Sequence, residues 1–390
     1  MKTALIALLA FMVVTPAVAS EPLANAARMR VAFDARRIID VRVSGLADRA
    51  TGRAATADDP ARIASISKMF VAMGVLRLVE AGRLDLDRDV STWLGWSLRN
   101  PAFPDQAITL RLLLSHQSSL TDDADYLIPL GQTVRDRLKN PKAWDAVHPP
   151  GTYFRYANLN FPVIATVMEA ATGERFDGLI TREVFKPLEL DACFNWTATC
   201  SDRSVQRAVV LYDEHGAVRK DDLHGARPAC LVQQPGPTTA CDLKRYTPGD
   251  NGGLFSPQGG VRISARELVK VGQLLLNVRS EFLSATSMAL LTTPVWRFDG
   301  HNGDTENGFF CAYGLAVQTL ANPGAGCDDD PFGDGRPRFG HAGEAYGLKS
   351  GLWVDRANGQ GMLWIITGVP DDTPRGRSAF YRVEEAIIGR

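Results

Sequence analysis

The sequence Ala64-Ser65-Ile66-Ser67-Lys68-Met69-Phe70 has the form Ser-x-x-Lys and stands at the start of an apolar run. The apolar residues after Lys68 recur at helical spacing, which predicts that the motif opens a buried amphipathic helix. Because residues three apart on a helix share a face, we expect Ser65 and Lys68 to point the same way. The first turn of a helix also has unpaired backbone N–H groups. A hydroxyl, an amine that can take its proton and N–H donors for an oxyanion are parts of a serine nucleophile site.

Composition and charge narrow the class of protein. The 390 residues include 43 Lys and Arg against 44 Asp and Glu, which gives a formal net charge of −1, and no basic tract stands out. This balance argues against a nucleic-acid partner and is typical of a globular protein with a sizeable core. We expect a monomer that acts on a small-molecule or peptidoglycan-type substrate without a cofactor.

The first residues have the features of a secretory signal peptide. Lys2 is followed by a short apolar run over residues 4–14 and then by Ala17-Val18-Ala19, which is typical of a cleavage site. The run is too short to span a bilayer, and no later stretch approaches about 18 unbroken apolar residues. We therefore expect a signal peptide over residues 1–19 and an exported chain, periplasmic or secreted, without a membrane span after cleavage.

Strand patterns occur near both ends of the chain, and helical patterns lie between them. Residues 29–33 and 38–43 are rich in β-branched and apolar residues and partly alternate with polar ones, as strands do. Residues 347–355 and 361–367 are two further apolar runs, and the turn at 356–359 between them predicts a hairpin.

This distribution predicts an α+β fold, in which helices flank an antiparallel sheet built from both ends of the chain. We assign residues 20–60 and 265–390 to the sheet part of one catalytic domain that spans 20–390. Residues 61–264 form its inserted, mostly helical part. Within that part, residues 201–250 are polar and rich in Gly and Pro, which indicates a long surface excursion.

A second motif, Tyr156-Ala157-Asn158, follows a turn at Pro150-Gly151. A buried tyrosine and a turn asparagine would explain it structurally. In a chemical interpretation, a phenol near a cationic lysine ionises more easily and relays a proton, while Asn158 holds a substrate carbonyl and the lysine. His116, at the end of an apolar helix capped by Thr109, is another candidate base, although a hydrogen-bonded structural histidine fits this position better.

Six cysteines in an exported chain indicate three disulfides. Short loops close at low entropic cost, so the spacing favours the near-neighbour pairs Cys193–Cys200, Cys230–Cys241 and Cys311–Cys327. None of the cysteines forms a Cys-x-x-Cys zinc or redox signature. The acidic stretches 85–89 and 328–330 lack the closing glutamate of a calcium loop, so we expect no metal site.

The third motif, His341-Ala342-Gly343-Glu344, precedes the predicted hairpin. Together, Ser65-x-x-Lys68, Tyr156-x-Asn158 and His341-Ala342-Gly343 resemble, in order and rough spacing, the motifs of serine hydrolases of the class C β-lactamase-like group. That group has a penicillin-binding-protein-like fold and includes D-alanyl-D-alanine carboxypeptidases, D-aminopeptidases and esterases. The resemblance extends over nearly the whole mature chain and includes residues 108–116, 154–173, 185–188 and 252–254.

The resemblance implies a role for each motif residue, although it leaves open whether the lysine or the tyrosine is the resting base. Ser65 would be the acylated nucleophile, Lys68 its activating or proton-relaying partner, and Tyr156 a second acid and base. Asn158 would position the substrate. The resemblance further implies that an oxyanion hole is formed by the backbone N–H groups of Ser65 and Glu344, and that the opposite wall of the cleft is lined by His341, Ala342 and Gly343.

The chain departs from the group at two places. Class C β-lactamases usually carry Lys-Thr-Gly where this chain has His341-Ala342-Gly343, and Ser118-Ser119-Leu120 stands where Ser-Gly-Leu is usual. An imidazole near its reference pKa of about 6.5 is mostly neutral at pH 7, and Ala342 lacks the hydroxyl of threonine. Both changes weaken contacts to an anionic substrate tail. We therefore expect poor β-lactam turnover and better activity on a neutral ester or on a D-amino-acid amide or peptide.

Two arrangements would favour the opposite substrate preference. Lys349 or Arg338 would supply a cation if either reached the cleft, and Glu344 would do so by holding His341 protonated. With either preference, the sequence predicts an exported serine hydrolase that works through an acyl-enzyme on Ser65. The alternative is a catalytically quiet penicillin-recognising or peptidoglycan-binding protein on the same fold.

Overall fold

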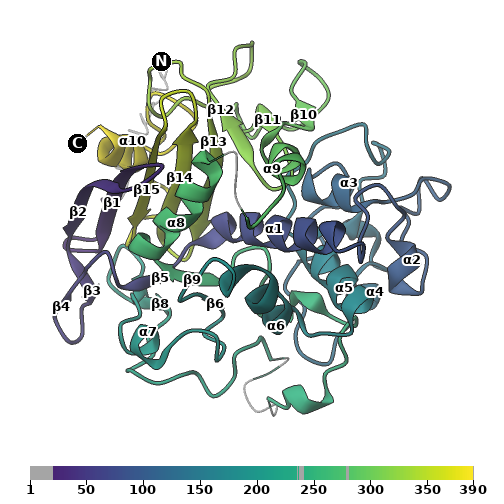
Figure 1. Ribbon diagram of the computed structural model, residues 1–390, viewed down its shortest axis with the longest axis horizontal. Coiled ribbons are helices and arrows are strands. Elements are labelled where there is room, and N and C mark those ends of the chain that lie inside the picture. The colour runs from purple at the N-terminus through teal and green to yellow at the C-terminus, as the bar shows by residue number, and fades with distance from the viewer. Residues whose placement is uncertain (1–20, 235, 237–240, 278–280, 390) are drawn as a thin grey trace, which may run out of the picture.

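The computed structural model describes residues 21–234, 236, 241–277 and 281–389, so the signal peptide expected over residues 1–19 lies outside the described part of the chain. The main element is an eight-stranded sheet in which all neighbouring strands are antiparallel (Figure 1). In spatial order, its strands are β10 (Trp296–Arg297), β11 (Ala312–Tyr313), β12 (Gln318–Leu320), β13 (Arg338–Ala345), β14 (Leu348–Asp355), β15 (Gln360–Ile366), β1 (Arg28–Asp34) and β2 (Ile38–Ser44).

The two ends of the chain meet inside this sheet, where β1 pairs with β15. Along β1, the side chains of Met29, Val31 and Phe33 are fully buried, and the residues between them are half-buried. A strand with one core-facing side has this period of two. The predicted α+β class, with an antiparallel sheet built from both chain ends, is confirmed.

The remaining elements lie mainly between β2 and β10 in the sequence. Short strands form three small sheets, from β3 (Leu46–Asp48) with β4 (Arg53–Ala54), from β5 (Pro60–Arg62), β9 (Val261–Ser264) and β6 (Cys193–Phe194), and from β7 (Leu211–Tyr212) with β8 (Val218–Lys220). The helices are α1 (Ser67–Glu80), α2 (Ser91–Leu94), α3 (Leu110–Leu114), α4 (Val134–Arg137), α5 (Asn160–Thr172), α6 (Phe176–Ile180), α7 (Asp202–Gln206), α8 (Ala265–Leu276), α9 (Ala285–Thr292) and α10 (Arg382–Ile388). Single turns are η1 (Ala64–Ile66), η2 (Pro141–Ala143), η3 (Thr181–Phe185), η4 (Leu243–Arg245) and η5 (Gly252–Phe255).

Helix α8 lies across one face of the sheet and packs against β1, β14 and β15 (Figure 1). It begins at Ala265, and the hydroxyl of the preceding Ser264 caps it by accepting a hydrogen bond from the N–H of Glu267 at 3.1 Å. A Cβ added at Gly272 of α8 would lie 2.2 Å from the ring of Phe33, and one added at Gly361 of β15 would also lie 2.2 Å from it. Two glycines thus make room for one buried ring between helix and sheet.

Helix α1 is largely buried and runs across the middle of the molecule, away from the sheet and toward α3 and α5 (Figure 1). The Ser-x-x-Lys motif was expected to open one helix, but it spans two elements. Ser65 lies in the 3₁₀ turn η1, and Lys68 lies in the first turn of α1. The tighter turn of η1 still leaves Ser65 and Lys68 on the same side, as the hydrogen bond between them shows.

The turn η1 lies directly against the third-motif strand, β13. A Cβ added at Gly343 of β13 would lie 2.5 Å from the carbonyl oxygen of Ile63, so only glycine permits this approach. Beside the nucleophile, Ala64 has a φ of 46°, a left-handed value that is strained for a residue with a Cβ. The packing between η1 and β13 therefore fixes the position of the nucleophile against the opposite wall.

Two turns have defined backbone features. Ser119, which stands where the resembled group usually has glycine, has a left-handed φ of 63°. The C-terminal helix α10 starts at Arg382 and follows a turn. The carboxylate of Glu385 accepts hydrogen bonds from the N–H groups of Arg377 and Ser378, at 2.8 Å and 2.9 Å, and holds this segment in a turn before the helix.

Three disulfides join Cys193 to Cys200, Cys230 to Cys241 and Cys311 to Cys327, which are the pairs expected from the spacing. The first two lie in the segment from β6 to β9, and the third joins the residue before β11 to the loop between β12 and β13. Within the described ranges, no helix is both long and apolar enough to cross a membrane.

We predict that Gly272→Ala destabilises the protein by about 1–3 kcal/mol, because the new methyl group would overlap the Phe33 ring. The matched control is Gly178→Ala in α6, where an added Cβ meets nothing within 4 Å. Since alanine is the better helix former, this control should be neutral or stabilising. Urea unfolding of both variants measures the two effects. Equal stability of the two variants would contradict the packing described for α8.

Candidate active site

Three segments far apart in the sequence meet at the side chain of Lys68. Its Nζ donates hydrogen bonds to Ser65 Oγ at 2.9 Å, to Asn158 Oδ1 at 2.8 Å and to the carbonyl oxygen of Gln258 at 2.8 Å. The side chain is fully buried. Burial lowers the pKa of Lys68 to about 7, against the opposing attraction of the Asp122 carboxylate. At neutral pH a substantial fraction of Lys68 is therefore the neutral amine, which can accept the Ser65 proton.

Tyr156 lies on the other side of the nucleophile. Its ring stacks on Phe310, with centroids 4.7 Å apart, and lies 5.0 Å from Lys68 Nζ. Burial raises the pKa of Tyr156 well above its usual value, although a hydrogen bond with Ser65 acts in the opposite direction. Tyr156 is therefore a neutral phenol at pH 7. Of the two bases that the sequence leaves open, this arrangement favours Lys68.

Asp122, which the sequence analysis did not single out, orients Asn158. Its Oδ2 accepts from the backbone N–H of Asn158 at 2.9 Å and from Nδ2 at 3.0 Å, and its Oδ1 accepts from the N–H of Leu159 at 2.9 Å. The side-chain oxygen of Asn158 is thereby turned toward Lys68. No local pattern in the sequence around Asp122 indicates this role.

His116 packs beside Tyr156 and is not placed to act as a base. It is buried, and its Nδ1 accepts from the N–H of Ala157 at 3.1 Å. Its ring lies 4.4 Å from that of Tyr156. Burial and the charge of Lys68 lower the pKa of His116 well below its usual value. The structural interpretation of this histidine, preferred from the sequence, agrees with these contacts.

His341 is also neutral, and both of its ring nitrogens are engaged. Its Nδ1 lies at 2.5 Å from the carbonyl oxygen of Ala342 and must donate to it. Its Nε2 therefore accepts from the hydroxyl of Tyr313 at 2.7 Å. Burial, followed by the charge of Lys68, lowers the pKa of His341 to about 3. Neither ring nitrogen is therefore available to a substrate carboxylate, which is in line with the weakened contacts to an anionic tail expected from the sequence.

The structure also tests the two arrangements that would place a cation near His341. Glu344 forms an ion pair with Lys349, not with His341. Arg338 pairs with Asp334 at 2.8 Å and does not line the cleft. Lys349 does reach the cleft, but it is bound there to Glu344.

The cleft beside the nucleophile has two halves, which share Ser65, Asn158 and Glu344. The half that we call the His341 half has a volume of 330 Å³ and includes Tyr156, Glu306, His341, Lys349 and Arg375. The half that we call the Arg62 half has a volume of 810 Å³ and includes Arg62, Tyr126, Lys220, Asp221, Arg262 and Tyr346. Ser65, Gly343 and Glu344, which the resemblance assigns to an oxyanion hole and the opposite wall, all line this cleft.

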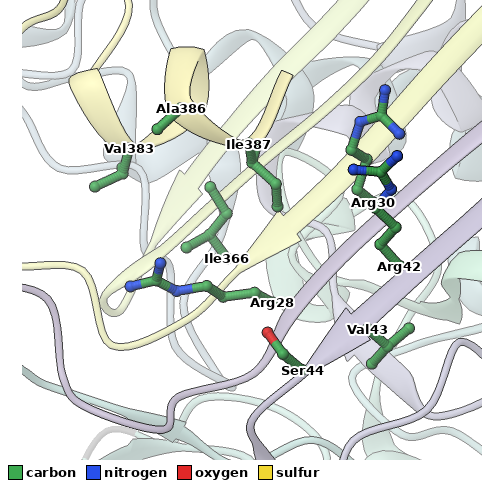
Figure 2. A pocket seen from close by; sticks show the side chains of 9 residues that line it. All are labelled: Arg28, Arg30, Arg42, Val43, Ser44, Ile366, Val383, Ala386 and Ile387. Atoms are coloured by element: carbon green, nitrogen blue, oxygen red, sulfur yellow. The ribbon is translucent and has the colours of Figure 1, made fainter. Parts of the chain in front are cut away.

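A smaller cavity of 180 Å³ lies where α10 covers β1 and β2 (Figure 2). Its lining combines Arg28, Arg30 and Arg42 with apolar residues of α10 and β15. Arg30 and Arg42 share the carboxylate of Asp40. None of the motif residues lines this cavity, so the chemistry is assigned to the cleft at Ser65.

The chain is similar to known proteins over most of its length. The Beta-lactamase family model matches residues 24–386. The chain is 26% identical over 258 residues to Penicillin-binding protein 4 of Amycolatopsis lactamdurans, covering 65% of this chain and 61% of that protein. It is 33% identical over 170 residues to Esterase EstB of Burkholderia gladioli, covering 39% of this chain and 42% of that protein. The matched segments thus span less than two thirds of these relatives.

Among solved structures, D-amino acid amidase from Ochrobactrum anthropi SV3, complexed with D-Phenylalanine, is similar with a TM-score of 0.64. The alignment covers 94% of this chain and 92% of the amidase at 19% sequence identity, which shows a shared fold. The fold predicted from the three motifs is therefore found in a known group of structures.

We predict that the rate at which a fluorophosphonate labels Ser65 rises with pH through a midpoint near 7. Only neutral Lys68 can accept the Ser65 proton, and burial lowers the pKa of Lys68 to about 7. Below the midpoint the amine is protonated and labelling slows. Intact-mass kinetics between about pH 5 and about pH 9 measure the profile. Lys68→Arg should lower the rate by roughly 10²–10⁴-fold, because a guanidinium cannot serve as a base.

Asp122→Asn provides a finer test of the same profile. The carboxylate stabilises the charged form of Lys68, so its neutralisation lowers the Lys68 pKa and shifts the midpoint to lower pH. The matched control is Asp123→Asn, which removes an exposed carboxylate next in sequence and should leave the midpoint in place. A midpoint that moves upward in Asp122→Asn would contradict the arrangement.

Proposed function

Since the chain belongs to the Beta-lactamase family, we propose that it is an exported serine hydrolase that acts through an acyl-enzyme on Ser65. The observation that carries the proposal is the contact between Ser65 Oγ and the Nζ of a buried lysine at 2.9 Å. The apolar N-terminal run and the three disulfides support export.

The proposed reaction starts with attack of Ser65 Oγ on the substrate carbonyl, while its proton passes to Lys68 Nζ. The negative charge that develops on the carbonyl oxygen is held by the backbone N–H groups of Ser65 and Glu344. As the bond to the leaving group breaks, the Tyr156 hydroxyl donates a proton to that group and is reprotonated from Lys68. Water then attacks the acyl-enzyme, and the same groups return the proton to Ser65.

We propose an ester or a D-amino-acid amide or peptide as substrate, in preference to a β-lactam. His341 is neutral and bound to Tyr313, so it supplies no charge for the carboxylate of a β-lactam. In the His341 half, Lys349 is paired with Glu344, and the charge of Arg375 is outnumbered by the carboxylates of Asp122, Glu306 and Glu344 that line the same space. An acidic surrounding of this kind disfavours an anionic tail. Relatives named as an esterase and an amidase make this choice of substrates reasonable.

Intact-mass analysis after exposure to a fluorophosphonate, a short acyl ester and a penicillin tests the proposed function. We expect one stable phosphonyl group on the peptide that contains Ser65 and turnover of the ester. Ser65→Ala should lose both. Labelling on another peptide would contradict the assigned nucleophile, and a stable penicillin adduct without any ester turnover would favour a quiet penicillin-recognising protein.

We further predict that kcat/KM is higher for p-nitrophenyl butyrate or a D-amino-acid amide than for nitrocefin. His341 offers no hydrogen bond to the carboxylate of nitrocefin. A hydrogen bond to a charged group contributes roughly 1.5–3 kcal/mol, which corresponds to about tenfold or more in rate. Steady-state kinetics on the three substrates measure the order. A preference for nitrocefin by orders of magnitude would show that the substrate class is wrong. His341→Lys is a poor control here, since it would bury a cation beside Lys68.

A further inference from the structure

Arg62 is a buried cation in the cleft that the proposed mechanism does not use. It ends β5, three residues before the nucleophile, and lines the Arg62 half together with Ser65. The residue is 6% exposed. Its Nε has no hydrogen-bond partner among the described residues, and no ion pair found in the described ranges includes its guanidinium. A buried charge without an acceptor is costly unless a ligand supplies one.

The nearest carboxylate is already committed to another arginine. Arg262 faces Arg62 across the β5–β9 pair. The two oxygens of Asp221 accept from Arg262 Nη2 at 2.7 Å and from Arg262 Nε at 3.2 Å, and both side chains of this pair are almost fully buried. The Asp221 carboxylate thus binds Arg262 directly and acts on Arg62 only through its charge, while Arg262 adds positive charge beside Arg62.

A third cation approaches from the surface excursion. The guanidinium of Arg62 lies 5.0 Å from the centroid of the Tyr346 ring, and the Nζ of Lys220 lies 5.7 Å from the same centroid. Burial, and then the charge of Arg262, lower the pKa of Arg62 to about 10, so it remains a cation at neutral pH. Two cations thus lie against one ring at the wall of the cavity, and groups of this kind bind carboxylates.

The position of Tyr156 indicates which part of the substrate enters this half. The acid that protonates the leaving group must lie beside it, and Tyr156 lines the His341 half but not the Arg62 half. The leaving group therefore lies in the His341 half, and the acyl portion lies in the Arg62 half. The larger volume of the Arg62 half, 810 Å³ against 330 Å³, leaves room for an extended acyl group.

We propose that Arg62, with Lys220 and Tyr346 beside it, binds a carboxylate carried by the acyl portion of the substrate. Arg62 is then a specificity-determining residue, and the preferred substrates are monoesters or monoamides of dicarboxylic acids or acyl groups that end in a free carboxylate. This inference rests on the proposed acyl-enzyme function. It specifies, in addition, the charge and the location of one substrate group.

The test compares two esters with the same leaving group. In p-nitrophenyl hexanoate and mono-p-nitrophenyl adipate, acyl chains of equal carbon number end in a methyl group and in a carboxylate, respectively. We expect the wild-type protein to show a kcat/KM for the adipate roughly tenfold to a hundredfold above that for the hexanoate. Added salt should reduce this preference, because it screens the attraction between the carboxylate and Arg62.

Three variants separate a binding role of Arg62 from a structural one. Arg62→Gln should lose the preference for the adipate while its kcat/KM on the hexanoate changes by less than about threefold. Arg62→Lys keeps the charge and should retain part of the preference. Arg219→Gln removes an exposed arginine that lines the same half and is the matched control, with little expected change. An equal loss on both esters in Arg62→Gln would overturn the inference and assign Arg62 to the framework.

The wild-type comparison decides the matter even if the Arg62 variants do not fold. Hydrolysis of the hexanoate with no preference for the adipate would overturn the anion site and leave the proposed serine hydrolase intact. Failure of Ser65 to react with a fluorophosphonate and with both esters would instead overturn the proposed function, and the anion site with it. Preference for the adipate, lost in Arg62→Gln, supports both.

Discussion

The site depends on keeping the amine of Lys68 in a fully buried position. A lysine whose pKa falls from 10.5 to about 7 on burial has lost stabilisation of its charged form on the order of 5 kcal/mol. The remaining charge is held by acceptors at Ser65, Asn158 and Gln258, which come from η1, from the start of α5 and from the loop before β9. No single segment could hold the amine, so the catalytic arrangement exists only when these parts of the chain have come together.

Several features elsewhere in the structure serve this arrangement. Asp122 fixes the direction of the Asn158 amide and, through its charge, keeps the Lys68 pKa from falling further. Gly343 lets β13 approach η1, which places the third-motif strand against the nucleophile. Ala64 has a left-handed backbone conformation directly before Ser65, and strain of this kind persists only where surrounding contacts determine the backbone. The strained backbone at Ala64 and the close approach at Gly343 therefore restrict the position of Ser65.

The sequence predicts those features that depend on local patterns. The spacing of Ser65 and Lys68, the capping residue Thr109 and the alternation along β1 are local, and the structure agrees with each of them. The grouping of Ser65 with Tyr156 came only from resemblance, because no periodicity relates residues so far apart.

Other contacts could not be predicted from local patterns. The acceptor at Gln258 is a backbone carbonyl, which every residue has, so its sequence carries no sign of the role. Asp122 and Arg62 look like ordinary charged residues, and only tertiary packing shows that one is bound to Asn158 and the other lacks an acceptor among the described residues. The state of His341 likewise depends on Tyr313, a distant partner that fixes its tautomer.

The buried Lys68 also affects the charge states of other residues in the cleft. Lys68 lowers the pKa of His341, and by reciprocity a permanent cation at position 341 would lower the pKa of Lys68. A neutral histidine bound to Tyr313 therefore preserves a Lys68 pKa close to neutrality. With no cation at 341, the cations that line the His341 half are Lys349, which is paired with Glu344, and Arg375, whereas Arg62 lies in the separate Arg62 half of the cleft. Placing the cation there permits recognition of an anion without disturbing the base.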